Sequence, residues 1–191
     1  MAGSPARAQE APSERPPDPE WNELVTQYQL FYSMGRYPEA AERAERALRR
    51  AEAIFGEESE QTAQVLNDLG HLALLQNDSS GAVTRHRRAL AIRERLFVSD
   101  GPAVVQSMRN LAKAYRAQGR FEEAADLLRR AMPIIERHVS GTDPFLVDVL
   151  KELAAALRRA GHPQEAGAVE SRIESIRAEV SSAPILQLEK R

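Results

Sequence analysis

The chain has 191 residues and a formal net charge of −2, with 42% hydrophobic and 5% aromatic residues. This near-neutral charge excludes a global attraction to nucleic acid or to an anionic membrane, and the absence of cysteine excludes disulfides, thiolate metal sites and a thiol nucleophile. Because Ala, Glu, Arg and Leu predominate, the composition predicts an all-α protein.

The two ends of the chain differ from its middle. Residues 1–20 contain five prolines together with serine and charges of both signs, which predicts a disordered or extended tail. Residues 181–191 are predicted to form a second tail. No apolar run is long enough to cross a bilayer, and no apolar segment precedes Ala8, where small residues resemble a signal cleavage site. We therefore expect a cytoplasmic location, the alternative being a periplasmic or secreted protein whose upstream signal was removed.

Between the tails, apolar residues recur at helical spacing in four successive pairs of segments. The first pair is predicted at 21–56, where Gly35 separates its two helices and Gly56 ends the second. Pairs of the same design follow at 60–98, 102–140 and 144–180.

The hinge between the two helices of a pair returns every 42 residues. Its positions are Gly35, Asn77, Gly119 and Gly161, and Asn is a suitable substitute because it tolerates the left-handed backbone conformation. Small residues follow the same period, at Ala40, Ala82, Ala124 and Ala166, and they let two helices approach closely. A fixed period of this size predicts a stacked array in which each pair buries its apolar face against its neighbours.

Two motifs carry a resemblance to a known family. Leu66-x-x-Leu69-Gly70-x-x-Ala73 and Gly119-x-Phe121-x-x-Ala124 resemble the tetratricopeptide repeat. The period of 42 would also suit HEAT or armadillo units, but the position-by-position match favours tetratricopeptide, and the long links between pairs resemble the kinesin-light-chain type. The resemblance covers about residues 21–180 and implies a right-handed α-solenoid of about four helix-turn-helix pairs.

This resemblance also implies a function, because such arrays hold peptides in a concave groove lined by the first helix of each pair. We therefore expect a noncatalytic protein-interaction scaffold. The predicted groove residues are Asn67, His71, Arg109, Lys113, Arg116 and Lys151. Their basic character favours a partner with acidic residues or a free C-terminal carboxylate. The alternative is that they form an ordinary solvated helix face.

A second functional hypothesis is a structural module that self-associates as a homo-oligomer. It would use an exposed apolar C-terminal end made by Val169, Ile173 and Ile176, together with Ile185 and Leu188.

Other classes of function find no support in the sequence. It contains no glycine-rich phosphate loop, nucleophile elbow or paired carboxylates, so we expect no enzymatic activity and no cofactor. The four histidines are dispersed, which argues against a metal site. The arginine-rich run at 85–88 lacks interleaved aromatic residues, so we expect no nucleic-acid partner.

Overall fold

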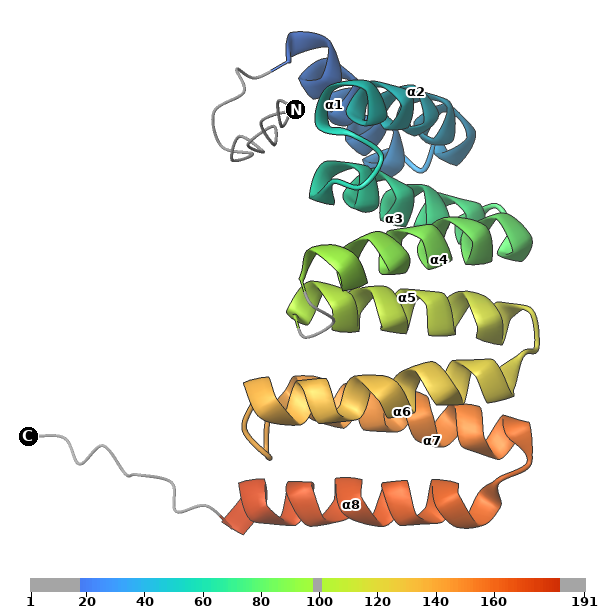
Figure 1. Cartoon of the computed structure of the whole chain (residues 1–191). Helices are drawn as coiled ribbons and strands as arrows, with labels where there is room; N and C mark the ends of the chain where they lie inside the picture. Colours follow the sequence, from blue (N-terminus) through green and yellow to red (C-terminus); the bar gives the residue numbers. More distant parts are fainter. Residues whose placement is uncertain (1–17, 98–100, 183–191) are drawn as a thin grey trace, which may run out of the picture.

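The computed structural model describes residues 18–97 and 101–182, which form eight α-helices and no β-strand. The helices are α1 (Pro19–Ser33), α2 (Tyr37–Phe55), α3 (Glu60–Leu75), α4 (Ser79–Leu96), α5 (Pro102–Ala117), α6 (Phe121–His138), α7 (Pro144–Ala160) and α8 (Pro163–Ser182). They follow one another down a single stack (Figure 1). The predicted all-α solenoid of four helix pairs is therefore confirmed. Residues 1–17 and 183–191 of the predicted tails lie outside the described residues, whereas Pro19 and Glu20 already belong to α1 and Ser181 and Ser182 still belong to α8.

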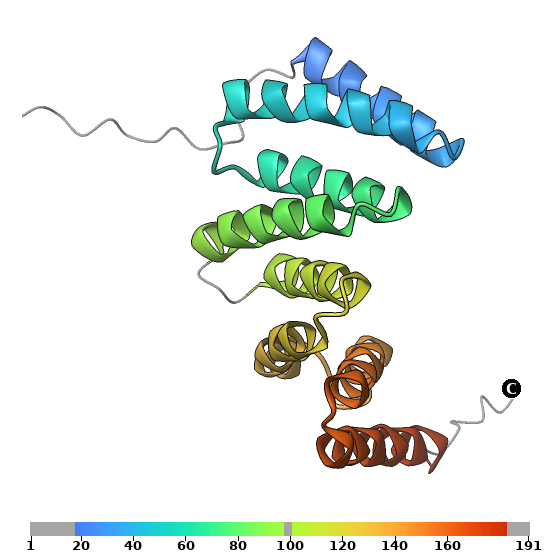
Figure 2. The same cartoon turned by 90° about the vertical axis from the view of Figure 1, so that its right-hand side faces the viewer.

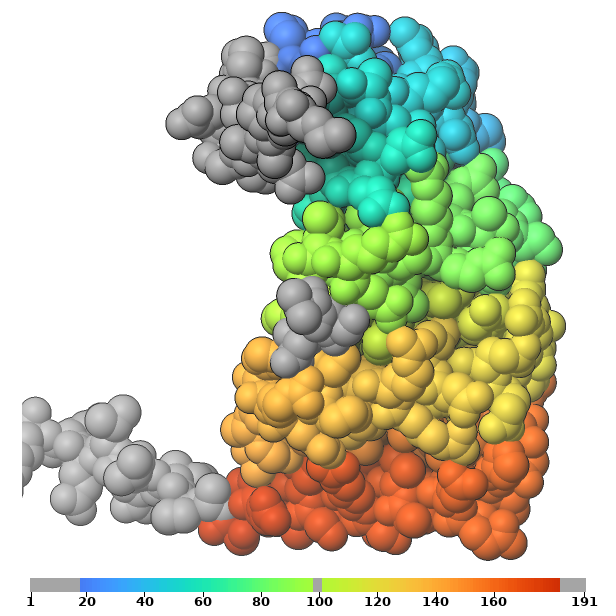
Figure 3. Space-filling view, viewed as in Figure 1, coloured from blue at the N-terminus to red at the C-terminus, as the bar shows by residue number. Residues whose placement is uncertain are grey.

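We call the first helix of each pair an A helix (α1, α3, α5 and α7) and the second a B helix (α2, α4, α6 and α8). Each helix packs mainly against the next one in the chain, and α3 also contacts α5 directly. The sequence of colours down the space-filling view shows the same nearest-neighbour order (Figure 3). The helix axes turn along the stack, because in Figure 2 α2 is seen from the side whereas α6 is seen nearly end-on.

The hinges confirm the repeat register at the level of the backbone. Gly35, Asn77, Gly119 and Gly161 have φ angles of 72°, 62°, 75° and 93°, and Asn77 is the one non-glycine residue with positive φ in the described ranges. A side chain other than that of Asn or Asp is costly in this conformation, which explains the restricted choice of residue at the hinge. The left-handed residue ends each A helix and turns the chain back along it.

The core consists mainly of small and aliphatic side chains at equivalent positions. Ala40, Ala82, Ala124 and Ala166 are each fully buried in the first turn of a B helix, as the prediction of close helix approach requires. Larger aliphatic residues such as Leu69, Leu111 and Leu153 fill the space between them. Burial of this apolar surface is the main contribution to the stability of the stack.

One repeat exchanges the sizes of two contacting residues. A Cβ placed on Gly70 would lie 2.5 Å from Cε1 of His86, so the imidazole occupies the space that a side chain at position 70 would need. One period later, Ala112 and Leu128 stand at the equivalent positions. His86 is fully buried, and neither of its ring nitrogens has a hydrogen-bond partner in the described part of the chain. Burial, with smaller effects from the charges of His71 and Lys113, lowers the pKa of His86 to about 3.

This buried imidazole predicts acid sensitivity. The unfolded chain binds a proton at His86 near pH 6.5, whereas the folded chain does so only near pH 3. The free energy of unfolding should therefore fall as the pH drops below 6.5, by about 2 kcal/mol at pH 5. Urea unfolding at pH 7.5 and pH 5 measures this loss. His86→Leu, which copies Leu128, should remove most of the loss, and His71→Gln should keep it. An equal loss in wild type and His86→Leu would contradict the assignment.

Candidate functional site

Side-chain hydrogen bonds join each A helix to the next. Between α1 and α3, Tyr28 Oη donates to Asp68 Oδ2 at 2.7 Å. Between α3 and α5, Asn110 Nδ2 donates to Asn67 Oδ1 at 2.6 Å. Between α5 and α7, Arg109 donates through Nη2 and Nε to both carboxylate oxygens of Glu152, at 2.7 and 3.1 Å. The A helices thus lie side by side along the solenoid, and any site on their shared face is built from more than one repeat.

The structure gives Asn67 and Arg109 a different role from the predicted one. Asn67 is only 7% exposed, and the side chain of Arg109 is 13% exposed and stacks over the Phe145 ring at 4.9 Å. Both side chains bond to the neighbouring A helix, so a ligand carboxylate would have to displace Glu152 to reach Arg109. The reason is that neighbouring A helices are offset by one residue from the period of 42. Asn67 therefore faces Asn110, and Arg109 faces Glu152, each 43 positions further along the chain.

Lys151 occupies the same register position in α7, the last A helix of the described chain. Its ammonium is exposed and lies 2.9 Å from Oδ1 of Asp148, one turn earlier on the same helix. An exposed pair of this kind contributes little to stability, so Lys151 is available to exchange partners.

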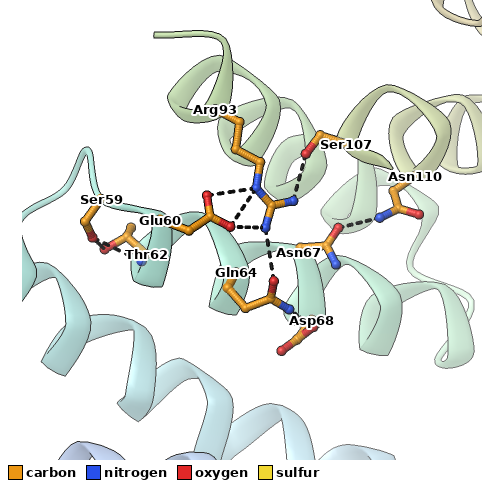
Figure 4. Close-up of polar contacts among 9 residues, drawn as sticks. All are labelled: Ser59, Glu60, Thr62, Gln64, Asn67, Asp68, Arg93, Ser107 and Asn110. Carbon is orange, nitrogen blue, oxygen red and sulfur yellow. Dashed lines mark hydrogen bonds and ion pairs between the residues drawn. The ribbon is translucent and has the colours of Figure 1, made fainter. Parts of the chain in front are cut away.

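A buried arginine organises the second repeat (Figure 4). Arg93 of α4 is 4% exposed and donates to both carboxylate oxygens of Glu60 at 2.7–3.1 Å, to Gln64 Oε1 at 3.0 Å and to Ser107 Oγ at 2.9 Å. It therefore ties α3, α4 and α5 together. Gln64 extends this hydrogen-bond network to Asp68, because its Nε2 donates to Asp68 Oδ1 at 3.0 Å. This network was not among the features predicted from the sequence.

The first pocket lies between α1 and α3, and we call it the aspartate pocket. It encloses about 330 Å³ and is lined by Tyr28, Gln29, Tyr32, Gln64, Asp68, His71 and Leu72. Burial raises the pKa of Asp68, and burial together with the nearby Asp68 charge raises the pKa of Tyr28. His71, predicted to face the groove, lies in this pocket with its ring 5.3 Å from that of His86.

The second pocket lies at the C-terminal ends of α5 and α7, and we call it the basic pocket. It encloses about 470 Å³ and is lined by Lys113, Arg116, Ala117, Phe121 and Arg159. In the described ranges none of its three cations forms an ion pair, and the guanidinium of Arg159 lies 4.5 Å from the Phe121 ring centroid. The structure thus places two predicted residues, Lys113 and Arg116, in one pocket. It adds Arg159, which was not predicted, because the period of 42 residues relates Arg116 to Arg158 and not to Arg159.

The apolar C-terminal end expected for self-association is not a free surface. Ile173 and Ile176 are buried, and Val169 packs against the same core cluster. The exposed positions of α8 include Glu174 and Arg177. These isoleucines therefore seal the last repeat; Ile185 and Leu188 lie outside the described residues.

Metal sites and membrane-spanning helices are two other kinds of functional element. Across residues 18–97 and 101–182, no group of three or more His, Asp or Glu side chains has an arrangement that could hold a metal ion. None of the helices in these ranges combines the length and apolar character needed to span a membrane. The cytoplasmic location stays a prediction.

Comparison with known families agrees with the helix pairs described above. A family model described as "Tetratricopeptide repeat" matches residues 29–95, 81–137 and 104–168. The chain belongs to the tetratricopeptide repeat family. Its repeat fold is typical of protein–protein interaction scaffolds. Comparison with curated protein sequences found no match.

Solved structures of similar fold include proteins with kinesin-light-chain repeats. BtubC (BKLC) from P. vanneervenii is 25% identical, with a TM-score of 0.78 over 90% of this chain and 69% of that one. A putative kinesin light chain with nearly identical TPR-like repeats from P. anserina is 24% identical, with a TM-score of 0.76 over 83% and 77%. The apo form of RapI is 16% identical, with a TM-score of 0.73 over 88% and 60%. The first two of these structures confirm the predicted kinesin-light-chain-like type of array.

Proposed function

We propose that this tetratricopeptide repeat protein is a noncatalytic scaffold that binds an acidic segment of a partner protein in the basic pocket. The observation that carries the proposal is the convergence of Lys113, Arg116 and Arg159 from two repeats, with no carboxylate paired to them in the described ranges. Most other arginines of the A and B helices already form an ion pair with an acidic residue. Arg109 pairs with Glu152, and Arg93 pairs with Glu60.

The chemistry of the pocket suits carboxylates. A guanidinium can donate two parallel hydrogen bonds to a carboxylate, and the Lys113 ammonium adds a compact positive charge. The Phe121 ring supplies an apolar wall on which Arg159 rests, which limits the motion of that side chain. Lys151 provides a further cation on the same helix as Arg159, so an acidic segment or a free C-terminal carboxylate can interact with more than one positive group.

The test is fluorescence anisotropy with a rhodamine-labelled peptide of glutamates that ends in a free carboxylate. Wild type should bind it, and the affinity should fall as salt screens the charges. The double variant Lys113→Glu/Arg116→Glu should weaken binding at least about tenfold, because it replaces attraction with repulsion at the centre of the pocket.

The matched control is Arg87→Glu/Arg177→Glu. It makes the same change in net charge at exposed positions of two B helices outside both pockets. This control should retain the affinity of wild type. An equal loss in both double variants would mean that net charge alone attracts the peptide, and no loss in either would remove the basic pocket as its site.

A further inference from the structure

We infer that the ligand is a bipolar segment. Its acidic residues occupy the basic pocket, and a basic side chain, arginine above all, sits at least about six residues away in the aspartate pocket. This inference rests on the proposed function for its acidic half, and it adds a second subsite of opposite charge.

The carboxylate of Asp68 differs from three other carboxylates of the A helices. Glu60, Glu152 and Asp148 each bond to a cation, respectively Arg93, Arg109 and Lys151. Asp68 receives hydrogen bonds from neutral donors, the Tyr28 hydroxyl and the Gln64 amide, and the Asn67 amide also lies close to it. The one cationic group near it is the His71 imidazole when that ring is protonated, and Asp68 pairs with no Lys or Arg in the described ranges. A desolvated carboxylate without a cationic partner is unfavourable, and a cation from a ligand would relieve that cost.

The walls of the aspartate pocket suit a long basic side chain. The ring of Tyr32, which is 47% exposed, offers apolar surface to an aliphatic stem. The same aromatic ring can hold a guanidinium by a cation–π contact, while Gln29 adds a polar group. Arginine combines the planar bidentate contact to a carboxylate with this stacking, so it is favoured over lysine.

The arrangement of the A helices sets the distance between the two subsites. The aspartate pocket lies between α1 and α3, and the basic pocket involves α5 and α7. Direct hydrogen bonds make α1, α3, α5 and α7 successive neighbours. Helices in close contact lie about 10 Å apart, and neighbouring A helices are separated by at least that distance, so two such steps place the pockets at least about 20 Å apart. An extended peptide covers about 3.3 Å per residue, which makes about six residues the minimum separation.

The opposite charges of the subsites also select one direction of the ligand along the solenoid. A segment inserted the other way would place its acidic residues beside Asp68 and its basic residue beside Lys113 and Arg116. Both ends would then meet charges of their own sign, which disfavours that orientation.

The experiment uses rhodamine-labelled peptides in which a glycine–serine spacer, the long spacer, sets one arginine at least about six residues from three glutamates. One peptide has the arginine at its N-terminal end, and a second has it at its C-terminal end. A matched set replaces arginine by alanine, and another set shortens the spacer to two residues. We expect the arginine peptide with the long spacer, in one of the two directions, to bind wild type about tenfold more tightly than its alanine counterpart. The short spacer should abolish this advantage.

Two variants assign the advantage to Asp68. Asp68→Asn keeps the shape of the side chain but removes its charge, and it should bring the arginine peptide down to the affinity of the alanine peptide, which itself stays unchanged. The control Glu174→Gln removes an exposed carboxylate of α8 and should change neither affinity.

The outcomes separate the two proposals. If wild type binds the alanine peptide but gains nothing from arginine, the basic pocket stands and the inference about Asp68 is overturned. A tryptophan peptide that binds more tightly than the arginine peptide and ignores Asp68→Asn would overturn it too, in favour of an aromatic anchor. If the alanine peptide does not bind, or Lys113→Glu/Arg116→Glu leaves its affinity unchanged, the proposed function itself fails.

Discussion

Ala124→Glu is expected to abolish the packing of the third repeat, with a loss of more than about 4 kcal/mol in the free energy of unfolding. Ala124 is 0% exposed in the first turn of α6 and belongs to the core cluster that extends from α3 to α8. A glutamate there would be larger than the available space, and its carboxylate would be buried without a cation. Because each repeat is stabilised by its neighbours, the damage should extend to both adjacent pairs.

Urea unfolding followed by circular dichroism measures this effect. The control Ala178→Glu introduces the same residue at an exposed position of α8 and should leave the midpoint nearly unchanged. Ala124→Ser adds a single oxygen and should cost much less than Ala124→Glu. A midpoint for Ala124→Glu equal to that of Ala178→Glu would show that the position is not a close contact between helices.

Arg93→Ala is expected to cost about 3 kcal/mol, the second largest effect on stability. The substitution removes a buried guanidinium that bonds to Glu60, Gln64 and Ser107 on two neighbouring helices. It leaves a cavity and takes away the cation that Glu60 faces. Because the Glu60 side chain is partly exposed, water can recover some of its solvation, which keeps the cost at the lower end of that for broken buried ion pairs.

The matched control lies on the same helix. Arg88 pairs with Glu52 at the surface of the stack, and Arg88→Ala should cost less than about 1 kcal/mol. Arg93→Lys, which keeps the charge but not the planar fork of donors, should fall between the two alanine variants. Equal losses for Arg93→Ala and Arg88→Ala in urea unfolding would mean that the buried network adds nothing beyond a surface ion pair.

Local patterns explain why the helices could be predicted. Helix ends depend on nearby residues, such as Gly119 and Asn77 with their left-handed backbone, and a recurring hinge identifies the repeat unit. Buried alanines such as Ala124 recur with the same period because close helix contacts recur. These features repeat along the chain, so each one supports the interpretation of the others.

Departures from the period could have revealed the buried polar network. Arg93 stands at the position occupied by Ile135 one repeat later, and Ser107 stands where Val65 and Val149 are found. Two polar residues at core positions that are otherwise apolar indicate that they form a hydrogen bond with each other. The structure shows this bond between Arg93 and Ser107. The size exchange of Gly70 and His86 leaves a similar trace in the register.

The sequence alone determined that this protein is a tetratricopeptide solenoid and that Lys113 and Arg116 carry positive charge on one face of an A helix. Only the tertiary structure decided which charges are free for a ligand. Arg109 is bound by Glu152, whereas Arg159 joins Lys113 and Arg116 in a pocket. The physical reason is that periodicity specifies the face of each helix, while the pairing of side chains depends on the offset between neighbouring helices, which is set by packing across repeats.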